Sequence, residues 1–148
     1  MRIQLGVPHS DPPRAEKTGR DPLSRMRAYQ LARGLLADSW SDAERLRHHL
    51  VTEKVSGQLY AAVGSIAANI AEGYSRSSGR DRARIFDYAL GSARESMTWY
   101  RSAEPVLGTE LVSGRLGTLE EIRRLLLAII PRERSRLIRP ANPEKPRK

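Results

Sequence analysis

Four arginines crowd one short stretch in the middle of the chain: Arg76, Arg80, Arg82 and Arg84, with Asp81 as the carboxylate among them. An arginine presents a planar fork of N–H donors that fits phosphate oxygens, and each phosphate contact with a nucleic acid releases counterions. The stretch therefore predicts a patch that contacts phosphates. The alternative is a solvated helix start, where cations lie unfavourably near the positive end of the helix dipole.

A second group of basic residues lies near the C-terminus. Residues 132–148 carry seven basic side chains against two glutamates, a net charge of +5. The arginines predicted to contact phosphates here are Arg132, Arg134, Arg136 and Arg139. The segment is either an arm that binds nucleic acid or a terminus that only aids solubility. Because the chain has no alternating aromatic residues for stacking on bases and no base-reading motif, we expect binding to be largely independent of nucleotide sequence.

Composition argues against enzymatic and metal-dependent functions. The 148 residues include no cysteine, which excludes disulfides, thiolate nucleophiles and cysteine-bound metals. His48 and His49 are adjacent and would point about 100° apart on a helix, so they are not expected to share a metal ion. Since no nucleophile, metal-ligand set or phosphate-binding loop is recognisable, we expect no catalytic residues, no metal, no cofactor and no enzymatic activity.

The charge of the chain is unevenly distributed along its length. The formal net charge is +9, of which only +3 lies on residues 22–131. Such an excess favours polyanionic partners, RNA or DNA among them. No apolar run approaches the roughly 20 residues that span a bilayer, and residues 1–13 lack the apolar core of a secretion signal. We therefore expect a cytoplasmic protein without a membrane partner.

Helices are predicted to position the two basic groups. Apolar residues recur every three or four positions, β-branched residues are sparse, and no alternating run of useful length occurs. Residues 1–21 lack periodicity and are predicted to be a disordered arm, and residues 138–148 a basic disordered tail. Between them, residues 22–137 are predicted to form an all-α, antiparallel up-down four-helix bundle with short loops.

Capping residues suggest the boundaries of the first two helices. Asp21 followed by Pro22 is a typical helix start. Ser41 and Glu44 form a capping box, which predicts that the first helix falters and restarts there. The apolar stripe of the second helix runs over residues 51–70 at steps of three or four.

The third and fourth helices have similar signals. Ser78 is a predicted N-cap and Gly108 a predicted C-terminal stop. The fourth helix could begin at Thr109 or at a capping box on Thr118, and one continuous apolar register favours Thr109. The third helix is apolar on two sides, which predicts two partners: its own bundle and a neighbouring subunit. One side carries Ile85, Ala89, Ser92, Trp99 and Ala103, and the other Phe86, Leu90, Ala93, Met97 and Tyr100.

A stretch over residues 64–101 differs from generic bundle sequence. Its notable residues are Ile66, Asn69, Glu72, Gly73, Gly91, Ser92 and Glu95. Asn69 and Glu72 are three residues apart and share a helix face, as do Ser92 and Glu95. Because small residues beside them let helices approach closely, we expect these polar pairs to form a buried hydrogen-bond network that fixes the register of the second and third helices.

This stretch resembles the four-helix-bundle proteins of 23S rRNA intervening sequences. The hallmark of that family, Ser-Ile-Pro-Ala-Asn-Ile-Ala-Glu-Gly, is matched over residues 65–73 except at Ala67, where proline is usual. Its second block is matched by Arg84, Ala89, Gly91, Ser92 and Glu95. The resemblance extends at the level of pattern over residues 22–137. Two departures matter: Ala67 should remove a kink from the second helix, and Arg82 replaces a usual aromatic residue.

The resemblance implies a non-enzymatic bundle that assembles as a ring, typically a homopentamer. The family includes the accessory variability protein of diversity-generating retroelements, which is basic, binds nucleic acid and associates with a reverse transcriptase and its template RNA. A similar role is therefore expected here, with structured RNA and a reverse transcriptase as partners. The alternative is a protein-interaction scaffold encoded in a rRNA intervening sequence.

Overall fold

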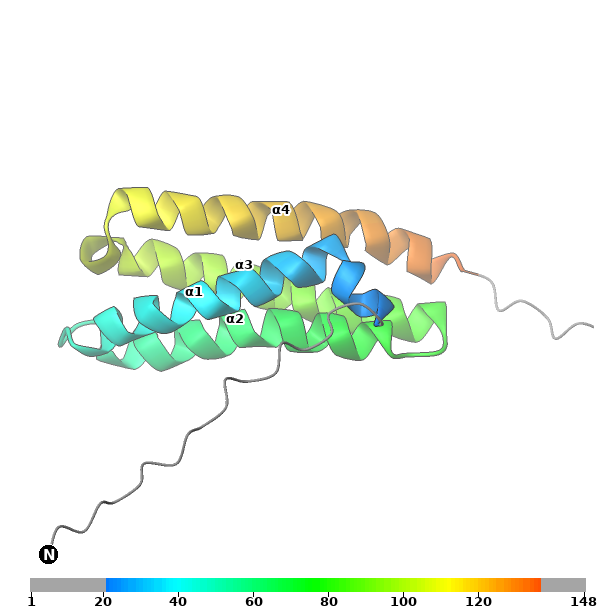
Figure 1. Ribbon diagram of the computed structural model, residues 1–148, viewed down its shortest axis with the longest axis horizontal. Coiled ribbons are helices and arrows are strands. Elements are labelled where there is room, and N and C mark those ends of the chain that lie inside the picture. Colours follow the sequence, from blue (N-terminus) through cyan, green and yellow to red (C-terminus); the bar gives the residue numbers. More distant parts are fainter. Residues whose placement is uncertain (1–20, 137–148) are drawn as a thin grey trace, which may run out of the picture.

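The computed structural model describes residues 21–136, and these are helical without any strand (Figure 1). The predicted N-terminal arm up to residue 20, the tail at 138–148 and Arg139 lie outside the described residues. Four α-helices follow a short 3-10 turn at Pro22–Arg25: α1 at Arg27–Arg47, α2 at Glu53–Tyr74, α3 at Gly79–Leu107 and α4 at Thr109–Arg134. The expected all-α bundle of four helices is confirmed.

Short connections make consecutive helices antiparallel neighbours. The end of α2, the start of α3, the end of α4 and the start of α1 lie at one end of the bundle (Figure 1). The α1–α2 and α3–α4 connections lie at the other end. This arrangement places segments that are far apart in the sequence next to one another.

Local capping explains several boundaries. The Asp21 Oδ1 atom accepts a hydrogen bond from the backbone N–H of Leu23 (3.0 Å) and starts the 3-10 turn. The Ser78 Oγ atom likewise accepts from the N–H of Asp81 (3.1 Å) at the start of α3. Gly108 ends α3 with a φ of 89°, a value that L side chains rarely adopt. The predictions for Ser78, for Gly108 and for an α4 start at Thr109 are confirmed.

Two boundary predictions are wrong. The helix α1 does not restart at Ser41, because the Ser41 hydroxyl donates back to the carbonyl of Asp38 (3.3 Å) and the helix continues to Arg47. The alternative start of α4 at Thr118, which the continuous apolar register did not favour, is excluded, because Thr118 lies inside the helix and its hydroxyl donates to the carbonyl of Gly114. Val51 lies in the α1–α2 connection and is 79% exposed, so the buried stripe of α2 begins only at Leu59.

Both apolar sides of α3 pack within the chain. This helix lies along both α2 and α4, and residues from each predicted stripe are buried, including Ile85 and Ala103 from one and Phe86 and Tyr100 from the other. The prediction that the second stripe needs a neighbouring subunit is therefore wrong. A central helix with two flanking helices of its own bundle satisfies the same pattern.

The predicted buried polar network between α2 and α3 does not form in the described chain. Glu72 is exposed and accepts a hydrogen bond from Arg76 (2.6 Å), while Glu95 is exposed and accepts one from the Trp99 indole (3.2 Å). The Ser92 hydroxyl donates to the carbonyl of Tyr88, one turn earlier. Each of these three groups therefore bonds to a residue four positions away on its own helix or the turn that follows it. Asn69 is half-buried and Gly91 is exposed.

Two other hallmark residues do belong to the core. Ile66 is fully buried, and Gly73 lies where α2 meets α3. A Cβ on Gly73 would lie 2.8 Å from the buried ring of Phe86 and 3.3 Å from the Cβ of Ile85. Glycine at this position therefore permits the close approach of the two helices.

A buried ionic network ties α1, α3 and α4 together. Asp42 is 1% exposed, and its Oδ2 atom accepts hydrogen bonds from the Tyr100 hydroxyl (2.8 Å) and from Nε of Arg115 (2.8 Å). Arg115 reaches Oδ1 of the same carboxylate at 3.3 Å and Oδ2 of Asp38 at 3.2 Å. Sequence reasoning did not find this network.

Candidate nucleic-acid interface

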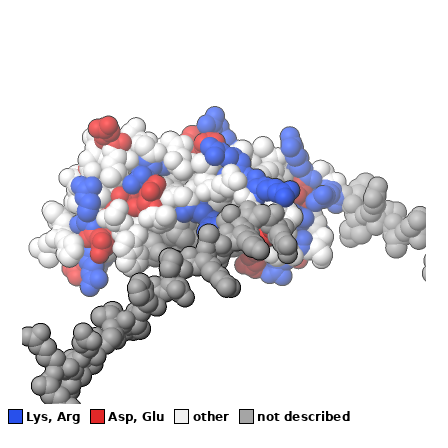
Figure 2. Space-filling view, in the orientation of Figure 1, with Lys and Arg blue, Asp and Glu red and all other residues white. Residues whose placement is uncertain are grey.

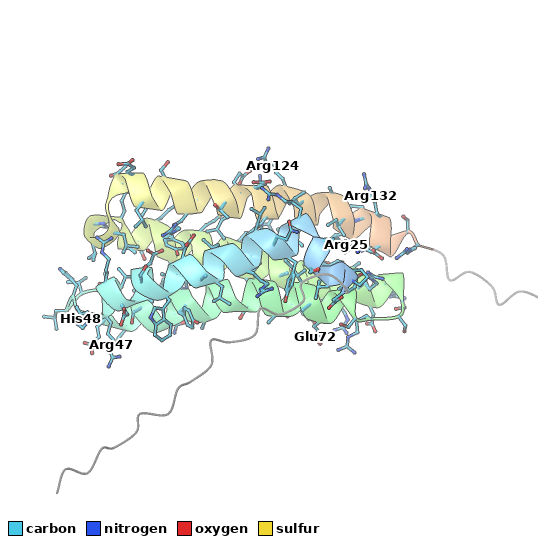
Figure 3. The ribbon with its side chains drawn as sticks, viewed as in Figure 1. Arg25, Arg47, His48, Glu72, Arg124 and Arg132 are labelled. Carbon is cyan, nitrogen blue, oxygen red and sulfur yellow. The ribbon has the colours of Figure 1, made fainter. Side chains whose placement is uncertain are left out.

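The two arginine groups predicted from the sequence meet at one end of the bundle. The α2–α3 turn and the end of α4 lie together there, with Arg132 projecting from α4 (Figures 1 and 3). We call this surface the basic end and define it by the arginines that it contains: Arg76, Arg80, Arg82, Arg84, Arg132, Arg134 and Arg136. Arg139, the eighth predicted contact residue, lies outside the described residues.

Close backbone packing brings the end of α4 onto the start of α3. Gly79 is buried, and a Cβ placed on it would collide with the carbonyl oxygen of Glu133 and approach the Cβ of Arg136 to 2.9 Å. The first residue of α3, which faces α4, must therefore be very small. This contact lets the end of α4 lie directly against the α2–α3 turn, so the two basic groups share one surface.

Arg82 contacts both α2 and α4 from its position on α3. Its guanidinium lies 5.2 Å from the centre of the Tyr74 ring, and its Nε atom is 3.5 Å from a carboxylate oxygen of Glu133. The side chain is only 19% exposed, and its Nε atom has no hydrogen-bond partner among the described residues. Arg82 thus joins α2, α3 and α4, and little of it is available to a ligand.

The other arginines are exposed and several have single carboxylate partners. The pairs are Arg76–Glu72 (2.6 Å), Arg84–Asp81 (3.1 Å), Arg134–Asp87 (2.8 Å) and Arg136–Glu133 (3.4 Å). Within residues 21–136, Arg80 and Arg132 form no ion pair, and both are exposed. Seven arginines therefore face four carboxylates, which leaves the surface strongly positive.

A shallow pocket of about 510 Å³ lies within the basic end. It is lined by Ser78, Arg80, Asp81, Arg84, Asp87 and Arg134. Hydrogen bonds that Arg84 donates to the Tyr88 hydroxyl (3.2 Å) and to Asp81 raise the pKa of its guanidinium. The positive charge in this pocket is therefore permanent. Exposed arginine–carboxylate pairs contribute little stability, so the guanidinium groups can exchange a carboxylate for a phosphate at small cost.

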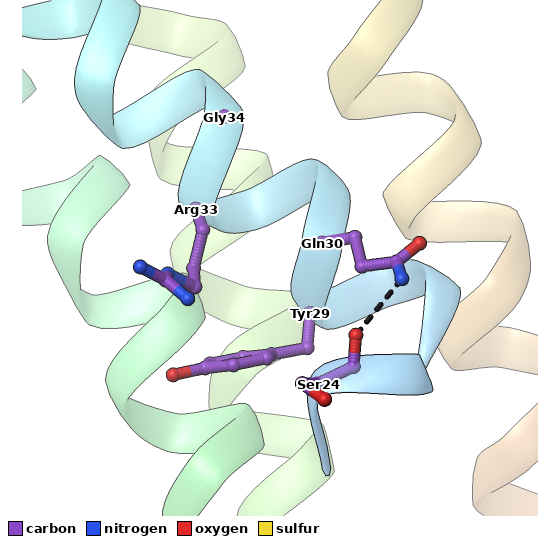
Figure 4. A pocket seen from close by; sticks show the side chains of 5 residues that line it. All are labelled: Ser24, Tyr29, Gln30, Arg33 and Gly34. Atoms are coloured by element: carbon purple, nitrogen blue, oxygen red, sulfur yellow. Dashed lines mark hydrogen bonds between the residues drawn. The ribbon is translucent and has the colours of Figure 1, made fainter. Parts of the chain in front are cut away.

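A smaller hollow of about 350 Å³ lies at the start of α1 (Figure 4). The Arg33 guanidinium lies 5.9 Å from the centre of the Tyr29 ring, and Gln30 donates a hydrogen bond to the carbonyl of Ser24 (2.8 Å). Arg25 is also at this side of the molecule (Figure 3). These residues were not predicted from the sequence, where the spacing of four between Tyr29 and Arg33 was the available signal.

Basic side chains predominate over one half of the face in Figure 2. They lie on the half where α4 ends, whereas acidic and basic side chains alternate over the other half. Elsewhere on α4, Arg123 pairs with Glu120, three residues earlier. On this face the excess of basic side chains therefore lies towards the end of the bundle where α4 ends.

The described residues show neither a metal-binding cluster nor a membrane-spanning helix. Residues 21–136 contain no cluster of three or more acidic or histidine side chains that could hold a metal ion. No helix in the same range combines the length and the apolar character required to cross a membrane.

Comparison with known proteins places the chain in a family. The family model for 23S rRNA-intervening sequence proteins matches residues 24–127. The chain belongs to this family. The match includes the turn with Arg76 to Arg84, and it ends before Arg132, so the second half of the basic end lies beyond the shared region.

A solved crystal structure has the same fold as this chain. It is the crystal structure of a protein of unknown function from the S23 ribosomal protein family of Bacteroides thetaiotaomicron. The two chains share 22% identity over 70% of this chain and 97% of the other, with a TM-score of 0.64. No curated protein matches the chain. The likeness therefore supports the bundle itself.

Proposed function

We propose that this 23S rRNA intervening-sequence protein is a non-enzymatic RNA-binding accessory protein whose basic end contacts phosphates. The observation that carries the proposal is the meeting of two arginine groups, about 50 residues apart in sequence, on one surface held by Gly79 and Arg82. The RNA ligand is structured RNA, read through its backbone. Two tyrosines accompany the arginines at the basic end, and each has a guanidinium over its ring: Arg82 lies 5.2 Å from the centre of Tyr74 and Arg84 5.8 Å from the centre of Tyr88. Neither ring forms part of a row of aromatic residues on which successive bases could stack.

The arginines of the basic end have three different roles in the proposed binding of phosphates. Arg80 and Arg132 form no ion pair with the described residues and are ready to contact phosphates. Arg84 and Arg134 face the shallow pocket and release their carboxylates when a phosphate enters. Arg82 holds the surface together, which makes it a positioning residue.

A homopentameric ring would multiply this surface. Support comes from hallmark residues that the packing of a single chain leaves unexplained: Glu72, Gly91 and Glu95 are exposed, and a Cβ placed on Gly91 would have no atom within 4 Å of it. Such small and polar residues on an outer face suit contact with another copy. Light scattering tests the ring: Gly91→Leu leaves the fold intact and lowers the assembled mass, whereas an unchanged mass contradicts assembly through this face.

The larger machine that this protein serves is a retroelement reverse transcriptase with its template RNA. The basic end lies at the start of α3, whereas Gly91 and Glu95 lie several turns further along this helix, which leaves room for RNA and protein contacts at the same time. The arrangement of neighbouring genes tests this role. A reverse transcriptase gene and a pair of repeats beside this gene support it, and a location within a rRNA gene contradicts it in favour of the scaffold role.

RNA binding is tested by two matched double variants. The first, Arg80→Ala with Arg132→Ala, removes two unpaired charges from the basic end. The control, Lys54→Ala with Arg101→Ala, removes two exposed charges from the other half of the bundle, near the start of α2 and the end of α3. Both variants change the net charge equally and leave the core untouched.

The measurement is fluorescence anisotropy of a labelled RNA hairpin at rising salt concentration. We expect the slope of log affinity against log salt to fall by about 1.5 in the basic-end variant, because two phosphate contacts at roughly 0.7–0.9 each are lost. The control should keep its slope. Equal losses in the two variants, or undetectable binding by the natural chain at low salt, would refute the proposal.

A further inference from the structure

A solvent-exposed aromatic cleft lies between α1 and α2, away from the basic end. Trp40 is 60% exposed and Tyr60 36%, and their rings meet edge to face with centroids 5.6 Å apart. The cleft has a volume of about 190 Å³, and Gly57 forms part of its wall with open space where a side chain would be. Large aromatic side chains are seldom left exposed in pairs without a partner.

The charged rim of the cleft carries one group of each sign. Glu44 and Arg47 both line it, and neither forms an ion pair with the described residues. A ligand suited to this cleft therefore has an apolar, rigid face that fits between the rings. It also carries an acidic and a basic group close together.

The C-terminal segment of the chain has this chemistry. Prolines recur at every third position, Pro140, Pro143 and Pro146, and Glu144 and Lys145 stand between the last two. A polyproline II helix has three residues per turn, so this spacing would align the prolines on one face. Aromatic-lined grooves recognise such proline-rich segments in the polyproline II conformation. The prolines near the N-terminus, Pro8, Pro12 and Pro13, do not share the spacing.

We propose that the aromatic cleft between α1 and α2 binds the proline-rich segment 139–148 of a second copy of this chain. The prolines lie against Trp40 and Tyr60, Lys145 faces Glu44 and Glu144 faces Arg47. Each of these contacts pairs a group of the cleft with a group of matching chemistry. The proposal is independent of RNA binding.

The length of the chain after α4 decides whether the segment 139–148 binds the cleft of its own copy or that of another copy. The contact of Asp42 with Arg115 places Trp40 near the level of Arg115 along the bundle. From Arg115 to Arg136, α4 and its end extend about 30 Å at 1.5 Å per residue. The seven residues from Arg136 to Pro143 span about 22 Å at 3.1 Å per residue, before any sideways distance is added. The segment up to Pro143 therefore falls short of its own cleft, and Pro146, at about 31 Å from Arg136, would have no length left for the sideways distance.

Cysteine cross-linking tests the proposal, because the natural chain has no cysteine. One full-length copy carries Gly57→Cys in the cleft, and a second, affinity-tagged copy carries Asn142→Cys. The control replaces Gly57→Cys with Gly114→Cys, an exposed glycine of α4 that also has open space around it. After mixing and mild oxidation, mass spectrometry quantifies the disulfide between the two copies.

We expect the 57–142 disulfide to form several-fold faster than the 114–142 disulfide. Replacing Pro140, Pro143 and Pro146 with alanine in the tagged copy, or Trp40→Ala in the other, should remove that difference. Since Trp40 is exposed, its replacement leaves the core intact, and circular dichroism verifies this. Equal rates at positions 57 and 114, or a rate that survives the proline replacement, would overturn the proposal. RNA affinity is measured in parallel, so failure of one idea is distinguished from failure of the other.

Discussion

Replacing Asp42 with alanine should destabilise the bundle far more than replacing its neighbour Asp38. Asp42 is the shared acceptor for the Tyr100 hydroxyl and for two nitrogens of Arg115, and it connects α1 to α3 and α4. Asp38 makes one contact with the same arginine, and its side chain is 57% exposed. The two carboxylates lie one turn apart on α1, so they form a matched pair.

The magnitude follows from what each replacement leaves behind. Without Asp42 the Tyr100 hydroxyl, on a residue with 0% exposure, has no acceptor, which costs about 1–3 kcal/mol. Arg115, with 23% of its side chain exposed, keeps only Asp38. Removing one partner of a buried ion pair costs about 3–5 kcal/mol in total. The loss of Asp38, an exposed partner, costs less than about 1 kcal/mol.

Urea denaturation followed by far-ultraviolet circular dichroism measures both effects. We expect Asp42→Ala to lower the free energy of unfolding by about 3–5 kcal/mol with an unchanged slope against urea, and Asp42→Asn to lie between it and the natural chain. Since small domains are stable by about 5–15 kcal/mol, the loss is easily resolved. A cost for Asp42→Ala no larger than that for Asp38→Ala would refute the assigned role of the network.

Three further outcomes follow from the same contacts. Burial raises the pKa of Tyr100 above its ordinary 10.0, and the hydrogen bond to Asp42 raises it further, so the unfolded state loses its proton first as pH rises. The contribution of the protonated Tyr100 to the free energy of unfolding should therefore be fully present below pH 10. Above pH 10 the free energy of unfolding should fall by about 1.4 kcal/mol per pH unit, and Tyr100→Phe should abolish this slope in denaturation curves at about pH 10–11.5. Gly73→Ala should cost about 1–3 kcal/mol in urea denaturation, because its Cβ would press on the buried Phe86 ring; a neutral effect contradicts the close packing. Gly79→Ala should displace the end of α4 and weaken binding of an RNA hairpin although every arginine remains, and unchanged anisotropy titrations contradict this.

The parts of the fold that could be predicted from sequence are local. Ser78 caps α3 through a hydrogen bond to the N–H three residues later, and Gly108 ends the helix through its own backbone conformation. Each signal needs only neighbouring residues, and each prediction was correct. Ser41 has the same kind of capping signal, but the helix restart predicted from it was wrong. Packing of the continuous helix α1 outweighs a cap worth about 1 kcal/mol.

The parts that could not be predicted depend on residues far apart in the chain. Asp42 meets partners 58 and 73 residues away, and nothing near Asp42 in the sequence names Tyr100 or Arg115. The polar hallmark residues were expected inside because a stripe of small residues predicts close approach. The spacing gives the shared face but not whether that face points inwards, and Glu72 and Glu95 prove to be exposed.

The basic end combines both kinds of information. Each arginine group is visible in the sequence, yet their meeting requires the α4 end to lie on the α2–α3 turn, where Gly79 admits the Glu133 carbonyl. Glu133 also receives Arg82, so one residue of α4 contacts both the glycine and an arginine of the turn. Since the family match ends at residue 127, this contact joins the shared region to an extension of the chain. Phosphate binding at this surface should therefore depend on the Gly79 contact as well as on charge.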